Sequence, residues 1–290
     1  MLRRCARRPA FATADDALAW CDAEHGNIVA ALRLADTDEA WRAGWRLPHA
    51  LFGFVQLRPG WTDWPDAHER ALTGVRRLGD RSGEAWALNA LGIAYTRIGR
   101  LAEGGAHLRR ALELRRELGD LGGEGATLNN LGELHRRAGR LDLALECHQR
   151  DLEICARLGD AYGESISLNN LGGVQLTLGR TEEALATQLR ALALIQGLGD
   201  RAFEAEVRYD LGEVHRAAGR RAAAEEEYRL AAASAAASGN VHRRAAALVS
   251  LTELTGAPAD AAAAGAALRE LTGAEAAPLE ARLAAALPPP

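Results

Sequence analysis

Leucines along the chain keep the three- and four-residue spacing of amphipathic helices. In one stretch they are Leu128, Leu131, Leu134, Leu141, Leu145, Leu152 and Leu158. Asp120 is suited to cap a helix from about residue 121 to 138, and Gly139 is suited to end it in the left-handed conformation. A second helix follows from about 141 to 158, and Gly159 ends it in turn. The pattern therefore predicts a helical hairpin.

Three markers of this hairpin recur at a step of forty residues. They are Leu-Gly at 91–92, 131–132, 171–172 and 211–212; Gly-Arg at 99–100, 139–140, 179–180 and 219–220; and Gly-Asp at 79–80, 119–120, 159–160 and 199–200. Such a period is typical of a solenoid, in which each unit covers the apolar face of its neighbour. We therefore expect an all-α chain with almost no strand, whose function lies on a surface.

The repeated unit resembles the tetratricopeptide repeat (TPR), in which a Leu-Gly pair in the first helix meets a small residue of the second. The matching glycines are Gly92, Gly132, Gly172 and Gly212; the small residues are Gly104, Ala144, Ala184 and Ala224; and later alanines are Ala111, Ala191 and Ala231, a series that Asp151 breaks. A forty-residue period resembles the long-helix variety found in kinesin light chains and actinobacterial regulators. The resemblance implies an α-α superhelix of about five to six hairpins.

Four repeats over residues 81–240 carry the full pattern, and the two ends depart from it. Residues 1–14 predict a flexible basic N-terminus, and 15–80 predict an N-terminal helix followed by a degenerate first repeat. In that repeat Phe52 replaces the close-approach glycine and Trp64 the small residue. All six tryptophans lie between Trp20 and Trp86, which indicates either an aromatic core or a docking face.

The C-terminal region, residues 241–290, predicts a degenerate repeat and capping helices. Their expected ranges are Val241 to Thr255, Ala259 to Leu271 and Pro278 to Leu287.

Residues 16–35 resemble a segment of AfsR-like actinobacterial regulators that lies between a nucleotide-binding (NB-ARC) switch region and long-helix tetratricopeptide repeats. The matching positions are Ala17, Leu18, Trp20, Glu24, Asn27 and Ala31. Nothing in the chain corresponds to the DNA-binding region or the nucleotide switch of that family, so neither activity is carried over. The chain is either a fragment of a longer regulator or a free-standing repeat protein, and its oligomeric state stays open.

Composition narrows the function further. All 35 basic residues are arginine, so a P-loop lysine, Schiff-base chemistry and a lysine general base are excluded within the chain. A net charge of −4 disfavours binding to nucleic acid or to a membrane surface. No segment is long and apolar enough to cross a membrane or direct export. Cys5, Cys21, Cys147 and Cys155 form no CxxC pair, which favours a reducing cytoplasm.

The resemblance implies that the first helices line a concave groove, at positions counted so that Gly92 is eighth. Asparagine recurs there at the fifth and sixth positions, although it costs about 0.6 kcal/mol relative to alanine in a helix. Its carboxamide both donates and accepts, so it either clasps a peptide backbone or links neighbouring repeats; both roles are compatible. The ladder comprises Asn89, Asn129 and Asn169, with Tyr209 after them, and Asn130 and Asn170, with Asp210 after them.

Arginines at the twelfth and thirteenth positions favour an acidic or carboxylate-bearing partner, because guanidinium binds carboxylates bidentately. Glutamates at the ninth position offset part of that charge, and two apolar side chains at the second position are candidate anchors. These residues are Arg97, Arg136, Arg137 and Arg216; Glu133 and Glu213; and Trp86 and Ile166.

No catalytic or metal-binding order is recognisable. His135 and His215 recur at the eleventh position and are expected to pack, and His148 is expected to be partly exposed. We therefore expect a non-enzymatic interaction module without cofactor or metal, which binds a peptide or protein segment in bacterial regulation. The alternative is a sensor of a small ligand that relays to an effector domain or partner.

Overall fold

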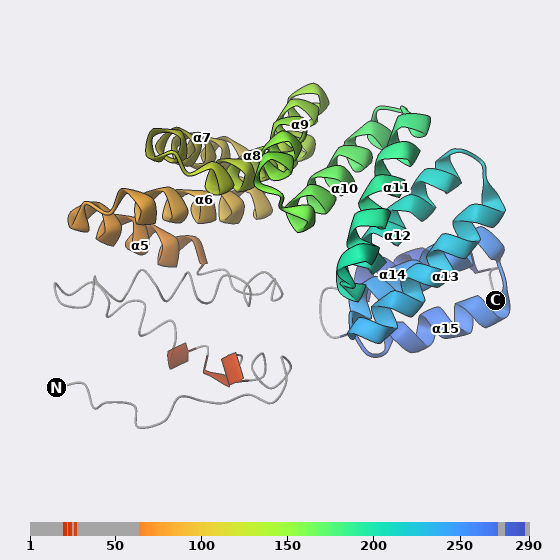
Figure 1. The fold of residues 1–290 in the computed structure, drawn as a ribbon. Coiled ribbons are helices and arrows are strands. Elements are labelled where there is room, and N and C mark those ends of the chain that lie inside the picture. The colour runs from red at the N-terminus through yellow and green to blue at the C-terminus, as the bar shows by residue number, and fades with distance from the viewer. Residues whose placement is uncertain (1–19, 22, 25, 28–63, 272–275, 288–290) are drawn as a thin grey trace. The chain divides into compact units, whose positions relative to one another are not determined.

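The computed structural model describes residues 20–21, 23–24, 26–27, 64–271 and 276–287. Every regular element in these ranges is helical, which confirms the predicted all-α fold (Figure 1). The chain divides into two compact units, Met1–Asn130 (unit 1) and Leu131–Pro290 (unit 2), and the boundary lies within one helix. The helices are α5 (Trp64–Leu78), α6 (Arg81–Arg97), α7 (Leu101–Leu118), α8 (Leu121–Arg137), α9 (Leu141–Leu158), α10 (Ala161–Thr177), α11 (Thr181–Leu198), α12 (Arg201–Ala217), α13 (Arg221–Ser238), α14 (Val241–Thr255), α15 (Pro258–Leu268) and α16 (Ala276–Ala286).

The Gly-Asp marker joins one hairpin to the next. Gly159 ends α9 in the left-handed conformation at φ +67°, where a side chain would be strained. Asp160 then caps α10, because its carboxylate accepts the backbone N–H of Gly163 at 2.9 Å. Asp120 accepts from Gly123 in the same way. These caps set the forty-residue period, and the helix ends fall within one residue of the expected 121–138 and 141–158.

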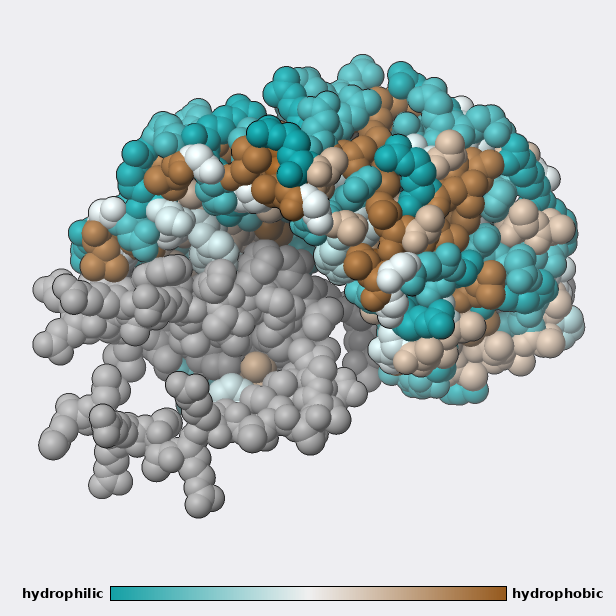
Figure 2. Space-filling view, viewed as in Figure 1, coloured by the Kyte–Doolittle hydropathy of each residue, from teal (hydrophilic) through white to brown (hydrophobic). Residues whose placement is uncertain are grey.

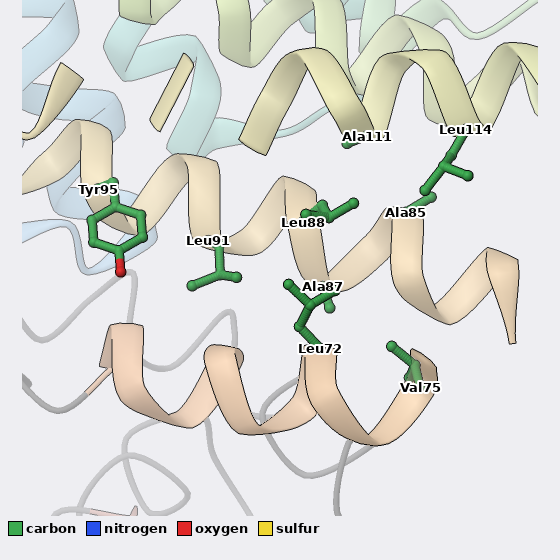
Figure 3. Close-up of a cluster of buried hydrophobic side chains, with 9 residues drawn as sticks. All are labelled: Leu72, Val75, Ala85, Ala87, Leu88, Leu91, Tyr95, Ala111 and Leu114. Carbon is green, nitrogen blue, oxygen red and sulfur yellow. The ribbon is translucent and has the colours of Figure 1, made fainter. Parts of the chain in front are cut away.

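Unit 1 has a hydrophobic core between α5, α6 and α7, which is mainly aliphatic but includes Tyr95. Figure 3 shows Leu72 and Val75 of α5 close to the leucines of α6, with Leu114 of α7 on the other side. Helix α6 packs against α7 at Gly92, where an added Cβ would lie 2.4 Å from Leu108. A Cβ on Gly104 would lie 2.9 Å from the Gly92 carbonyl oxygen. The expected close approach of these two glycines is therefore present.

Unit 2 repeats the hairpin with a different covering residue. The glycines at this contact are Gly132, Gly172 and Gly212, and an added Cβ would meet His148, Gln188 and Tyr228 at 2.5, 2.9 and 2.6 Å respectively. Polar side chains thus occupy the place that Leu108 holds in unit 1.

The C-terminal helices close the apolar core of unit 2. Residues of α14, α15 and α16 form one buried cluster that includes Val249, Leu268 and Leu279. The helix α14 has its expected bounds, whereas α15 ends at Leu268, three residues earlier than predicted, and α16 begins at Ala276 rather than Pro278. Pro258 starts α15, where a missing N–H costs no intrahelical hydrogen bond.

Several predictions for the N-terminal region lie outside the described residues. They concern Cys5, Phe52, the matching positions Ala17, Leu18 and Ala31, and the side chain of Trp64.

Candidate functional site

The asparagines of the ladder differ in exposure. Asn89 and Asn169, both at the fifth position, are buried at 8% and 9% exposure. Asn129, Asn130 and Asn170 are half-buried on the first helices of their repeats. Position along the period therefore fixes the helix face but not the access of each carboxamide to a partner.

Hydrogen bonds join the fifth position of one repeat to the sixth of the next. In unit 1, Asn130 Nδ2 donates to Asn89 Oδ1 at 3.1 Å. In unit 2, Asn169 Nδ2 donates to Asp210 Oδ2 at 2.9 Å, and the Tyr209 hydroxyl lies 3.2 Å from Ser250 Oγ. The predicted structural role of the ladder, a link between neighbouring repeats, is therefore present at these contacts.

The carboxyl of Asp210, which accepts the Asn169 hydrogen bond, has a raised pKa. Burial raises the pKa of its carboxyl to about 6, against the opposing effects of Arg243 and the Asn169 hydrogen bond. Arg243 also lies over the Tyr209 ring, 4.5 Å from the centroid, and pairs with Glu206. Polar groups of α10, α12 and α14 in unit 2 are thus linked by hydrogen bonds, an ion pair and a cation–π contact.

The predicted arginines are exposed at the ends of the first helices, and those of unit 2 are paired within their own helix. Arg136 and Arg137 both bind Glu133, at 2.7 and 2.6 Å. Burial alone raises the pKa of Glu133, but hydrogen bonds from the two guanidinium groups outweigh burial and lower it. Arg216 pairs with Glu213. Two positive charges therefore share one carboxylate at Glu133, while the Arg216 charge is matched.

The two predicted apolar anchors are half-buried. Trp86 packs against the core of unit 1, with its ring 5.3 Å from His68. Ile166 lies on α10 in unit 2. Both leave part of their surface at the solvent.

His148 is fully buried, at 1% exposure, so the expectation of partial exposure was wrong. The imidazole packs against Gly132, where the missing side chain makes room for the ring. Burial lowers its pKa to about 4, and neither ring nitrogen has a hydrogen-bond partner among the described residues. A neutral histidine thus replaces an aliphatic side chain at this contact.

Two other buried polar residues at the same position, Gln188 and Tyr228, reach the first helices. Gln188 Nε2 donates to the Asn169 backbone carbonyl at 3.1 Å, and the Tyr228 hydroxyl donates to Glu213 at 2.6 Å. Sequence reasoning missed them, although the forty-residue step from Leu108 through Gln188 to Tyr228 is the signal that could have found them.

Asp151, which breaks the alanine series, belongs to a buried polar cluster in unit 2. The Ser167 hydroxyl donates to Asp151 Oδ2 at 2.5 Å, and Cys155 Sγ lies 3.7 Å from Oδ1. Burial raises the pKa of Asp151 to about 6 and that of Cys155 to about 11. The cysteine thiol is therefore protonated at neutral pH.

Other candidate chemistry is sparse in the described ranges. His135 and His215 are half-buried, and burial lowers the pKa of His215. Cys147 and Cys155 are not joined in a disulfide. Across the described residues, no three His, Cys, Asp or Glu side chains converge to hold a metal ion, and no helix is long and apolar enough to span a membrane.

The sequence profile of the tetratricopeptide repeat family matches three overlapping windows, residues 83–157, 123–197 and 163–237, which together cover more than half of the chain. The chain belongs to this family. Tetratricopeptide repeats generally mediate protein–protein interactions, and their fold is typically a non-enzymatic scaffold. No protein with a curated description matches the sequence.

Solved structures support the same fold. Aspartyl phosphate phosphatase F from Bacillus subtilis matches with a TM-score of 0.69 at 14% identity, covering 97% of this chain and 69% of its own. A signal transduction ATPase with numerous domains, with a tetratricopeptide repeat sensor, from Pyrococcus horikoshii matches at 0.57 and 16%, covering 88% and 47%. A Rap protein complexed with competence and sporulation factor matches at 0.61 and 14%, covering 93% and 78%. At these identities the likeness shows the tetratricopeptide fold alone.

Proposed function

We propose that this tetratricopeptide repeat protein is a non-enzymatic module that binds a peptide or protein segment on the surface of its first helices. The observation that carries the proposal is that each unit by itself has half-buried carboxamides on its first helices, Asn129 and Asn130 in unit 1 and Asn170 in unit 2. A carboxamide offers both a donor and an acceptor to an extended backbone, whatever its sequence. A bacterial, cytoplasmic regulatory setting of the AfsR-like kind is part of the proposal.

The bound state of a structural neighbour supports this proposal. The Rap protein with the same fold was solved with competence and sporulation factor bound. The Pyrococcus horikoshii neighbour carries tetratricopeptide repeats named as a sensor, which keeps a small-ligand sensor as the second candidate.

A random peptide array tests the proposal. Wild-type protein is expected to bind a subset of peptides, and Asn129→Ala with Asn170→Ala is expected to weaken those complexes by about tenfold, through lost backbone hydrogen bonds. Gln149→Ala is the matched control, because this exposed carboxamide lies on α9, a second helix. Equal loss in the control, or no selected peptide with wild-type protein, would contradict the proposal; the latter outcome favours the small-ligand sensor.

Charge reversal tests the acidic character of the partner. Arg136 and Arg137 share a single carboxylate, so this end of α8 keeps an excess positive charge. Replacing both with glutamate is expected to abolish a preference for acidic peptides on the array and to weaken the salt dependence of binding. An unchanged preference would exclude the two arginines from the binding surface.

A further inference from the structure

Helix α16 packs through one face on the last hairpin of unit 2, which α14 and α15 form. Its Leu279 belongs to the buried cluster that also holds Val249 of α14 and Leu268 of α15. Residues of α16 three or four positions apart share this face. Those that are buried or half-buried are Ala276, Leu279, Arg282, Leu283 and Ala286. The opposite face of α16 is exposed.

The residues of α14 beneath α16 occupy the positions that the resemblance assigns to the groove. In the register used above, Ala246 is at the second position, Ser250 at the sixth and Glu253 at the ninth. Ala246 is 4% exposed and shares the buried cluster with Leu279. Ala126, the alanine at the second position of an earlier repeat, is exposed. In the last repeat α16 therefore covers part of the surface on which the proposed function places the peptide.

Arg282 extends this cover to polar groups. Its Nε and Nη2 donate to the two carboxylate oxygens of Glu253, both at 2.8 Å, and Nη2 also donates to Ser250 Oγ at 3.0 Å. Ser250 Oγ in turn lies 3.2 Å from the Tyr209 hydroxyl, the last link of the ladder. The apolar residues of α16 thus cover the core, whereas Arg282 takes hydrogen-bonding groups of the first helices.

Few contacts hold α16 in this place. The helix has eleven residues, of which Ala276 and Leu279 are buried. A helix of this length is marginal in water by itself, so α16 depends on its contacts with α14 and α15. The pair of Arg282 with Glu253 is partly exposed, at 37% and 28%, and such pairs contribute little to stability. Displacement of α16 therefore costs less than opening a complete hairpin.

We propose that α16 is an internal competitor for the first-helix surface of unit 2, and that a partner peptide gains Ser250 and Glu253 by displacing Arg282. This inference rests on the proposed function and adds its regulation. A peptide that replaces α16 at α14 carries a guanidinium for the Glu253 carboxylate and an apolar side chain in the place of Leu279. The acidic residues of the same peptide are expected at the end of α8.

Arg282→Ala tests the competition in the full chain. The variant is expected to bind array-selected peptides about three- to tenfold more tightly than wild type, because a competitor lowers the apparent affinity by the fraction of surface that it covers. Arg244→Ala is the matched control, since Arg244 pairs with Glu270 at 2.6 Å within the last hairpin, away from α16. The control is expected to bind like wild type. Equal or weaker binding by Arg282→Ala would overturn the proposal.

Hydrogen exchange of wild-type protein gives a second test that needs no variant. An array-selected peptide is expected to speed amide exchange in α16, because the displaced helix loses the contacts that keep it folded. If a peptide binds while exchange in α16 is unchanged or slower, α16 is not a competitor, although the proposed function stands. If wild-type protein selects no peptide, the proposed function fails and the competitor with it.

Discussion

The contact between the two helices of a hairpin is apolar in unit 1 and polar in unit 2. In unit 1 Leu108 covers Gly92, whereas in unit 2 His148 covers Gly132 and Tyr228 covers Gly212. In both units a Cβ on this glycine would collide with the covering side chain, so the repeat requires the glycine but not one kind of covering residue. The comparison shows that the period fixes geometry, while the chemistry beneath each first helix varies between repeats.

This difference connects to the proposed binding surface. In unit 2 Gln188 holds the backbone of α10 and Tyr228 holds the Glu213 carboxylate of α12. An aliphatic side chain such as Leu108 forms no hydrogen bond. Gln188 and Tyr228 therefore orient groups on the first helices of unit 2, whereas His148 forms no such hydrogen bond among the described residues.

The largest expected effect removes the close approach that both units share. Gly92→Ala would place its Cβ 2.4 Å from Leu108 and 3.1 Å from the Gly104 carbonyl oxygen. Overpacking of this kind costs about 1–3 kcal/mol. Thermal unfolding is expected to show a large drop in Tm, with Gly197→Ala as the control that has open space. A neutral Gly92→Ala would show that the hairpin tolerates a wider spacing.

The next effect converts a polar contact of unit 2 into that of unit 1. His148→Leu removes two ring nitrogens without partners among the described residues and is expected to stabilise the protein by about 1–2 kcal/mol. The pKa of His148 falls from about 6.5 to about 4 on folding, so the unfolded chain binds more protons between these values. The contribution of neutral His148 to folding stability is therefore fully present above pH 6.5 and is lost as the pH falls toward 4.

Urea unfolding of wild type and His148→Leu at several pH values measures this effect. The variant is expected to lose stability less steeply from pH 6.5 to 4 than wild type. Parallel pH profiles would mean that His148 does not titrate differently in the folded protein.

An effect of similar size, at Asp151, has the opposite dependence on pH. Asp151→Ala with Ser167→Val reproduces the next repeat, in which Ala191 and Val207 share an apolar cluster. The pKa of Asp151 rises from 3.8 to about 6 on folding. The contribution of protonated Asp151 to folding stability is therefore lost as the pH rises through that range. The double variant is expected to gain about 1–2 kcal/mol at pH 7 and less at pH 4. A gain that is equal at both pH values would contradict the assigned pKa.

The smallest effect concerns the ladder in unit 1. Asn89→Ala removes the acceptor of the Asn130 hydrogen bond and is expected to cost about 1 kcal/mol in chemical unfolding. Asn89→Asp keeps an acceptor and is the control for the hydrogen bond. Full stability of Asn89→Ala would show that this link does not hold the two repeats together.

The fold could be predicted from the sequence because Gly159 ends one helix and Asp160 caps the next. The same Gly-Asp pair recurs every forty residues. The helix face on which the asparagines lie could also be predicted, because helical spacing fixes it. Their hydrogen-bond partners were not, because Asn169 and Asp210 lie forty-one residues apart and only the packing of α10 on α12 brings them together.

The exposure of individual side chains and the space around individual glycines were the hardest features to predict from the sequence. Nothing in the Gly172-Gly173 pair tells which glycine is covered by Gln188 and which faces open space. The burial of His148 was missed because histidine replaces a residue that the period expects to be apolar. Both depend on which side chain of the neighbouring helix reaches the position.

The surface of unit 2 offers an alternative to the first helices. Hydrophobic residues gather in brown patches between hydrophilic ones on the face shown in Figure 2. On the second helices α9 and α11, the leucines Leu158, Leu189 and Leu198 are about half exposed, at 48% to 50%. These leucines are the alternative binding surface to the first helices, on which the proposed function places the peptide.

Amide hydrogen exchange of the protein with and without an array-selected peptide tests that placement most directly. If the first helices bind the peptide, amide exchange is expected to slow in α8, α10 and α12, with the strongest protection around Asn170 on α10. Protection confined to α9 and α11 would contradict it and move the binding surface to the exposed leucines of the second helices.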